Sequence, residues 1–441
     1  MNTYLGVDAV TSAARALAHR LPGQCRLRSV GASRAGDSLW LLTVGRSVPS
    51  GRDVLVVAGP HACEPTGGNT ILNLAEQVAR EPDLRRDRVW HFLLCLDPDG
   101  TRLNESWFSQ PWDLYAYFRG YYRPLPEFQP EWLPHEDAGP QPETAALLKV
   151  LDELRPAVQF SLHTKDMGGG WIQLTHELSR AGDAVVASAV RSQVPLEVAP
   201  ADTVGLLEVD QATFLMPTDS RAGNPLGDWT RHTTWLHAAR RYKTASCVVE
   251  APMWALPSTQ NRRPCPRPAI TLRSLATQMN NRIDALAAHF SRARPHLAAL
   301  STDPVAQAAW STMDICRATA AQWTRHADDA DAARYAMSAG GAVSLSVVAH
   351  RLPLRAAALL CRALGRSGSS ASALRYVVED LLASWCHELM ATLEPSWIPL
   401  TSQVAFQADL VVALVRAFDA SSASCAEAQH SELDRATGYV R

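Results

Sequence analysis

Three short apolar runs, each followed by a residue able to bind a metal ion or accept a proton, constrain the fold of this chain most. They span residues 54–58, 157–162 and 245–249, and their length and aliphatic character predict buried strands. Helix-like periods separate them along residues 1–300, which is typical of an α/β sheet. In such a sheet ligands bind at the carboxyl ends of the strands, so the residues after each run are candidate site residues.

The residues at these strand ends form one metal-binding set. His61 and Glu64 follow the first run, in the segment PHACE, and His163 follows the second. Zinc accepts imidazole nitrogen and carboxylate oxygen, and three protein ligands leave its fourth position open for water, as in hydrolytic sites. Glu250, after the third run, is then a spare carboxylate that can take a proton from that water. We predict that His61, Glu64 and His163 bind one Zn²⁺ per chain and that Glu250 is the catalytic base.

The order of four motifs argues against purely structural interpretations, such as a core histidine at His163 or a buried ion pair at Glu250. The segments PHACE, LDPDG, SLHT and VVEA occur in this order. In this respect the chain resembles the zinc metallocarboxypeptidases of the funnelin type, a carboxypeptidase A-like family, over residues 5–300. The resemblance implies a mixed, mainly parallel sheet flanked by helices. It also implies a zinc-dependent hydrolase that cleaves the C-terminal amide bond of a peptide or an amino-acid conjugate.

The chain departs from the family pattern where substrate is bound. Asp97 stands where the family usually has Asn, and the Asp-Leu-Asn-Arg segment that grips a terminal carboxylate is not present in that form. The resemblance leaves Arg102, Asn104 and Arg123 as candidates for the functions of this missing segment. We expect Arg102 to stabilise the oxyanion. Asn104 and Arg123 are expected to bind the substrate carboxylate, since a planar guanidinium pairs with it bidentately.

These departures leave other functions open. Many family members place a Tyr over the bound substrate, whereas this chain has Asp228 and Trp229 in the corresponding neighbourhood. One alternative is therefore a zinc amidase or deacylase that processes a small-molecule biosynthetic intermediate. Another is a non-catalytic binding protein on a peptidase scaffold, although none of the predicted ligands is lost.

The domain organisation follows from length and pattern. At 441 residues the chain exceeds one typical domain, and after Pro304 strand-like runs give way to Ala/Leu-rich helical periods. We expect a catalytic domain at residues 1–300, closed by a helix at residues 271–293 against the sheet. An appended all-α bundle is expected at residues 301–441. It would offer a surface for homodimerisation or for contact with a carrier that bears the substrate.

Charge and composition bound the partners and the compartment. The net charge of −2 gives no electrostatic reason to bind nucleic acid or an anionic membrane. No run of the sequence reaches the roughly 18 apolar residues of a membrane span. The nine cysteines lack paired spacing, and their odd number argues against a disulfide framework. We therefore expect a cytoplasmic protein.

Overall fold

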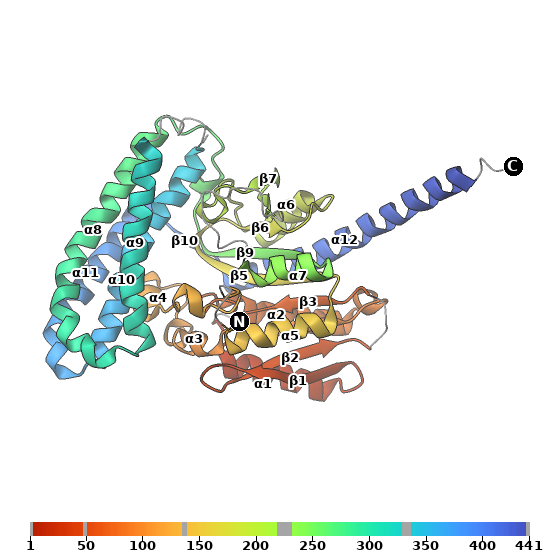
Figure 1. Ribbon diagram of the computed structural model, residues 1–441, viewed down its shortest axis with the longest axis horizontal. Helices are drawn as coiled ribbons and strands as arrows, with labels where there is room; N and C mark the ends of the chain where they lie inside the picture. The colour runs from red at the N-terminus through yellow and green to blue at the C-terminus, as the bar shows by residue number, and fades with distance from the viewer. Residues whose placement is uncertain (1–2, 47–50, 135–138, 218–231, 329–336, 438–441) are drawn as a thin grey trace.

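The protein consists of a twisted sheet covered by helices and a bundle of long helices beside one end of that sheet (Figure 1). The computed structural model describes residues 3–46, 51–134, 139–217, 232–328 and 337–437, and for 299 and 422–437 it describes the backbone only. Asp228 and Trp229 lie outside the described residues. Eight of the nine cysteines have a described side chain, and all eight are free.

The sheet is mixed, as predicted. Its centre is parallel, in the order β4 (Trp90–Leu93), β3 (Val54–Val57), β5 (Val158–Gly168) and β9 (Ala245–Ala255). Antiparallel pairs flank this centre on both sides. The flanking strands are β1 (Cys25–Ala32), β2 (Ser38–Val44), β6 (Trp171–Leu174), β7 (Leu207–Asp210) and β8 (Thr213–Leu215), and β10 (Ser396–Trp397) pairs with β9.

Strands β5 and β9 are longer than the sequence predicts. The apolar runs end at His163 and Glu250, but each strand continues for several residues beyond them. The two residues therefore lie in the middle of their strands, and the prediction that they stand at strand ends is wrong. The extension is buried because the helical bundle packs over it, so that Met167, Met253 and Trp254 belong to the bundle core.

Alternating residues of the central strands pack against different helices, as the pleat of a strand requires. Val54 and Val56 face the layer formed by α1 (Val7–Arg20), α2 (Thr66–Arg80), α6 (Ala181–Ser192) and α12 (Leu400–Thr437). Leu55 and Val57 face α5 (Pro142–Leu154) and α7 (Thr234–Tyr242) on the other side. Two short helices, α3 (Pro98–Arg102) and α4 (Leu114–Gly120), lie between the sheet and the bundle.

The bundle contains α8 (Pro268–Leu297), α9 (Pro304–Asp328), α10 (Ala339–Arg366) and α11 (Ser372–Leu393). Helix α8 packs along α9 and α10, not against the sheet as expected. Helix α12, in contrast, leaves the bundle and returns to the sheet, where Leu410, Val411 and Leu414 are buried under the strands. The predicted boundary at residue 300 therefore does not follow the packing. An apolar stripe shows that a helix is buried, but it does not show which element buries it.

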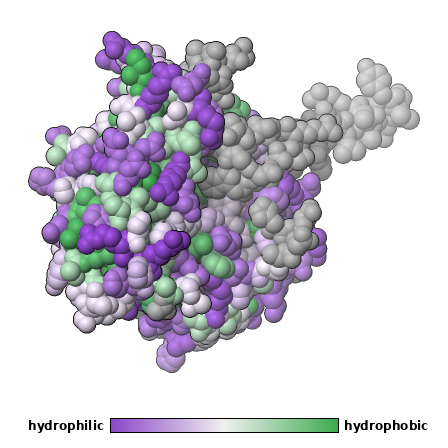
Figure 2. Space-filling view, turned by 60° about the vertical axis from the view of Figure 1, so that its left-hand side comes forward, coloured by the Kyte–Doolittle hydropathy of each residue, from purple (hydrophilic) through white to green (hydrophobic). Residues whose placement is uncertain are grey.

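Helix α10 is long and apolar enough to cross a membrane by length and composition, which the sequence reading missed. In the structure 78% of the most apolar 18-residue stretch of α10 is buried, because α10 contacts all the other bundle helices. Its apolar character is thus explained by its place in the core. At the surface of the bundle, hydrophobic residues are interspersed with hydrophilic ones in small patches (Figure 2). The large apolar or aromatic side chains exposed on the bundle include Trp310, Tyr376 and Met390.

Candidate metal centre

A tight turn after β3 places two of the predicted ligands. Gly59 has φ of +57°, and a Cβ at this position would lie 2.8 Å from Cys95 Sγ. The turn therefore requires glycine. The chain then presents His61 and Glu64 before α2 begins at Thr66, and both side chains are buried.

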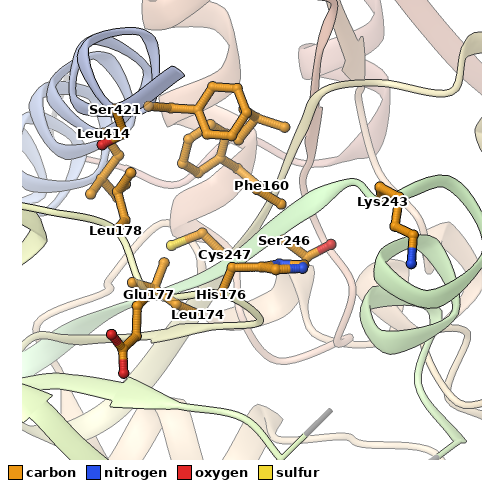
Figure 3. A pocket seen from close by; sticks show the side chains of 13 residues that line it. Phe160, Leu174, His176, Glu177, Leu178, Lys243, Ser246, Cys247, Leu414 and Ser421 are labelled. Atoms are coloured by element: carbon orange, nitrogen blue, oxygen red, sulfur yellow. The ribbon is translucent and has the colours of Figure 1, made fainter. Parts of the chain in front are cut away.

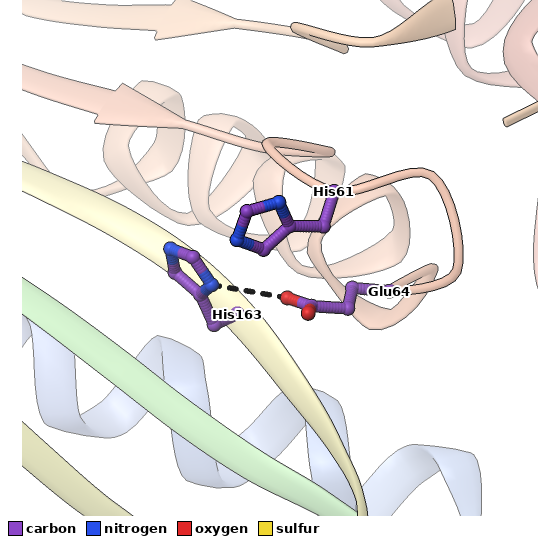
Figure 4. Close-up of side chains that lie close together, drawn as sticks. All are labelled: His61, Glu64 and His163. Carbon is purple, nitrogen blue, oxygen red and sulfur yellow. Dashed lines mark ion pairs between the residues drawn. The ribbon is translucent and has the colours of Figure 1, made fainter. Parts of the chain in front are cut away.

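The structure brings His61, Glu64 and His163 together (Figure 4). One ligand atom from each lies within 4.8 Å of the others, and His163 Nδ1 is 3.0 Å from Glu64 Oε2. The buried Nδ1 of His61 has no hydrogen-bond partner among the described residues, although buried polar atoms are almost always paired. Two imidazoles and one carboxylate, with a nitrogen left unsatisfied, fit a zinc ion.

Glu131 holds His163 from the other side, and the sequence analysis missed it. Its Oε2 lies 3.0 Å from His163 Nε2, while its Oε1 accepts hydrogen bonds from Trp235 Nε1 and Ser161 Oγ. A carboxylate behind a ligating histidine fixes the ring so that the other nitrogen faces the metal. Glu131 belongs to no recognisable motif, so its role could not be predicted from the sequence.

The two histidines differ in their electrostatic surroundings. Burial, together with the positive charges of Arg123 and His163, lowers the pKa of His61 well below its usual value. Burial also opposes the charged form of His163, but the carboxylates of Glu131 and Glu64 outweigh it and raise the pKa of His163 well above its usual value. His61 is therefore neutral, as a ligand must be, whereas a metal ion has to displace a proton from His163.

Glu250 lies directly beside His163, because the two residues are register partners on β9 and β5. Its Oε1 is 3.8 Å from His163 Nδ1. Burial raises the pKa of Glu250 to about 8, and the nearby Glu64 carboxylate adds to this effect against the attraction of His163. The structure thus places a carboxylate with a high proton affinity at the edge of the ligand set, where the sequence predicts the base.

Arg123 also reaches the ligand set. Its Nη1 lies 3.2 Å from Glu64 Oε1, and its Nη2 donates to Gln129 Oε1 at 3.1 Å. The side chain is 27% exposed, so protein does not enclose it completely. This position is compatible with the predicted binding of a substrate carboxylate.

The structure contradicts the roles predicted for Arg102 and Asn104. The guanidinium of Arg102 donates to the carboxylates of Asp8 and Asp37 at 2.6–3.1 Å. Asn104 is fully buried, and its amide pairs with the backbone of Tyr122 in both directions. Both side chains therefore stabilise the loop after β4, and neither is available as an oxyanion or substrate partner. Their partners are distant in sequence, so local spacing could not reveal them.

Charged residues of the bundle meet β5 just beyond His163, which the sequence did not indicate. Asp166 is buried between Arg351 and Arg355 of α10, at 2.8 and 3.0 Å. Burial would raise the pKa of Asp166, but the two guanidinium groups hold it well below its usual value. Arg351 also lies 3.6 Å from Asp202. The bundle is thus ion-paired to the strand that carries His163.

A separate cavity lies at the other end of the same strands (Figure 3). Its volume is about 470 Å³. It is lined mainly by apolar side chains of β5, β9 and α12, such as Phe160, Cys247 and Leu414. Val158 and Ala245, the first residues of β5 and β9, also line it. None of the metal-binding residues reaches it, so it is distinct from the candidate metal centre.

Comparison with known proteins agrees with this geometry. Residues 10–114 match the family model described as zinc carboxypeptidase. The chain resembles the zinc carboxypeptidases. The match includes His61 and Glu64, confirms the resemblance seen in the motifs, and supports a zinc-metallocarboxypeptidase-like hydrolase. No curated protein matches the chain.

Solved structures with a similar arrangement include a metallo-carboxypeptidase from Burkholderia cenocepacia, with 15% identity over 56% of this chain and 60% of that one, and a TM-score of 0.39. Carboxypeptidase A from Helicoverpa armigera has 13% identity over 57% and 65% of the two chains, and a TM-score of 0.38. Bovine thrombin-activatable fibrinolysis inhibitor, solved with a tick carboxypeptidase inhibitor, has 14% identity over 57% and 86%, and a TM-score of 0.37. This chain thus spans less than two thirds of the length of the Burkholderia cenocepacia and Helicoverpa armigera proteins.

Proposed function

We propose that this protein is a zinc-dependent hydrolase that cleaves the C-terminal amide bond of a peptide or an amino-acid conjugate. One observation carries the proposal. A buried set of two histidines and one glutamate has a further carboxylate, Glu250, 3.8 Å from a ligand nitrogen of His163. A structural zinc site has four protein ligands, whereas a hydrolytic site has three and a nearby base.

The residues of the candidate site have different roles in the proposed hydrolysis. His61, Glu64 and His163 would hold the zinc ion, which when bound supplies Lewis-acid activation of water and of the substrate carbonyl. Glu250 takes a proton from the attacking water and passes it to the leaving nitrogen. Burial raises its proton affinity, and the positive charge of a bound zinc ion would keep the carboxylate ionised near neutral pH. Once Glu64 is engaged by a metal ion, Nη1 of Arg123 is available to pair with a substrate carboxylate.

One observation favours the alternative of an amidase or deacylase that acts on a small biosynthetic intermediate. The polar groups of Arg102 and Asn104 are engaged in structural contacts. Of the three residues predicted to assist catalysis or bind the substrate carboxylate, only Arg123 is therefore left to bind that carboxylate. An enzyme that does not require a free terminal carboxylate would not need more.

Paired substrates separate these functions. The zinc-loaded protein would be assayed with an N-acyl dipeptide that has a free C-terminal carboxylate and with the same dipeptide amidated at its C-terminus. Preference for the free carboxylate supports the carboxypeptidase function, and equal turnover of both forms supports the amidase. Zinc binding without turnover of any amide substrate would instead support the non-catalytic binding protein.

The Glu250→Gln variant tests the mechanism. The amide has the same volume but cannot accept a proton at neutral pH, so turnover should fall by about 100- to 10,000-fold while zinc content stays that of the wild type. The matched control is Asp202→Asn, which removes a carboxylate whose charge acts on Glu250 but which is no ligand or base. It should keep turnover within about tenfold. Full activity of Glu250→Gln would remove Glu250 from the mechanism, and loss of zinc would make it a fourth ligand.

A further inference from the structure

We propose that the C-terminal helix α12 positions the metal centre through two buried amides, Gln403 and Gln407, which tie together the segments that carry the ligands. Both side chains are fully buried, and they lie four residues apart on α12, on the same face of the helix. The inference rests on the metal site proposed above. It extends that site to a helix that follows the whole bundle in sequence.

Gln407 joins β5 to α2. Its Nε2 donates to the backbone carbonyl oxygen of His163 at 2.7 Å, across 244 residues of sequence. Its Oε1 accepts from Thr70 Oγ1 at 2.7 Å. Thr70 lies on α2, the helix that begins at Thr66, directly after the loop that carries Glu64. One amide therefore fixes the distance between the strand of one ligand and the helix that anchors another.

Gln403 repeats this arrangement one turn earlier. Its Oε1 accepts from Thr66 Oγ1 at 2.9 Å and from Tyr4 Oη at 2.8 Å. Its Nε2 donates to the backbone oxygen of Ile398 at 2.8 Å, in the connection that leads from β10 to α12. Thr66 is the first residue of α2, so this contact holds the start of the helix next to Glu64.

These two glutamines stand in an otherwise apolar face, which makes a purely packing role a poor explanation. The neighbouring Phe406, Leu410 and Val411 are buried among aliphatic residues, and apolar side chains would fill the same space without the cost of burying amides. The amides add directional contacts, because the nitrogen and the oxygen of each amide both have a hydrogen-bond partner. Metal affinity depends on ligands held within about 0.5 Å of their productive positions, and groups behind the ligands supply that constraint.

The test uses the full chain. Gln407→Met keeps the length and apolar packing of the side chain but removes both hydrogen bonds. We expect its zinc affinity, measured by competition with a chelator, to fall about 10- to 100-fold, and the visible spectrum of the cobalt-substituted protein to change. The matched control is Leu414→Ala on the same helix, which lines the distant cavity. It should lower the melting temperature at least as much and leave zinc affinity and the cobalt spectrum unchanged.

The outcomes distinguish this inference from the proposed function. A wild-type protein that binds no zinc overturns both. Wild-type zinc affinity and an unchanged cobalt spectrum in Gln407→Met overturn only the positioning role, as does an equal loss of affinity in Leu414→Ala, which would indicate general destabilisation. If Gln407→Met does not fold, Thr70→Val removes the partner hydroxyl from α2 with little change of shape. That variant should also weaken zinc binding, and unaltered affinity there would overturn the inference.

Discussion

Replacing Asp97 by Asn should stabilise this protein, and the gain should grow with pH. Asp97 lies in the turn after β4, where its Oδ1 accepts a hydrogen bond from Gly100 N at 2.9 Å. Its Oδ2 is buried and finds no hydrogen-bond partner in the part of the chain that the structure describes. The same turn packs against the metal-binding loop, because a Cβ at Gly100 would lie 2.6 Å from that of Ala62. A buried, half-satisfied carboxylate thus supports the loop of His61 and Glu64.

The magnitude follows from the pKa of this carboxyl group. Burial raises the pKa of Asp97 from 3.8 to about 7, so the folded state binds the proton more tightly than the unfolded state does. A group with a raised pKa contributes stability that is fully present below the unfolded pKa and is lost as pH rises through the folded pKa. At about 1.4 kcal/mol for each pH unit, the loss between pH 3.8 and about 7 amounts to about 4 kcal/mol at most.

Asparagine keeps the acceptor for Gly100 N but does not titrate. The difference in unfolding free energy between Asp97→Asn and the wild type should therefore increase from about pH 4 to about pH 7 and stay constant above that range. Chemical denaturation at a series of pH values measures this difference directly. Asp166→Asn is a control of opposite sign, because the pKa of Asp166 is lowered by Arg351 and Arg355 despite its burial. This variant should lose stability at neutral pH.

The test is how the difference in unfolding free energy changes with pH, and not its absolute value. The buried asparagine amide has a free-energy cost of its own, which does not depend on pH. A curve that is flat between pH 4 and 7, or that falls, would refute the reasoning. It would mean that the ionised Asp97 carboxylate does not destabilise the folded protein, because water or a shift of the turn solvates it. A rising curve with a plateau above pH 7 would locate the cost at this one carboxylate.

Two further predictions concern the metal centre. Glu131→Gln should weaken zinc binding about tenfold or more, because a neutral amide supports the His163 ring less than a carboxylate does; chelator competition measures this, and unchanged affinity would make Glu131 a purely structural residue. Arg123→Ala should raise KM for substrates with a free terminal carboxylate by an amount equivalent to a few kcal/mol and leave amidated substrates nearly unaffected. Equal losses on both would assign Arg123 to the oxyanion or to the support of Glu64.

The sequence was enough to predict which residues form the candidate metal-binding cluster, because the evidence for them is local. Gly59, Pro60, His61 and Glu64 lie within one short turn, so covalent geometry alone keeps the two ligands close. His163 and Glu250 each follow an apolar run, and burial of such runs in neighbouring parallel strands brings them side by side. The α/β character of residues 1–300 and the presence of long C-terminal helices follow from periodicity in the same way, whereas the mixed, mainly parallel sheet was implied by the family resemblance.

Only the tertiary structure decided which polar groups serve the site. Arg102 was predicted to stabilise the oxyanion, but it forms ion pairs with Asp8 and Asp37. Nothing in its local sequence distinguishes it from Arg123. Glu131 and Gln407 belong to no motif, yet they hold the ring and the backbone of His163. The physical reason is that apolar burial is encoded by patterns of neighbouring residues, whereas the partner of a hydrogen bond or ion pair is chosen by packing between segments far apart in the chain.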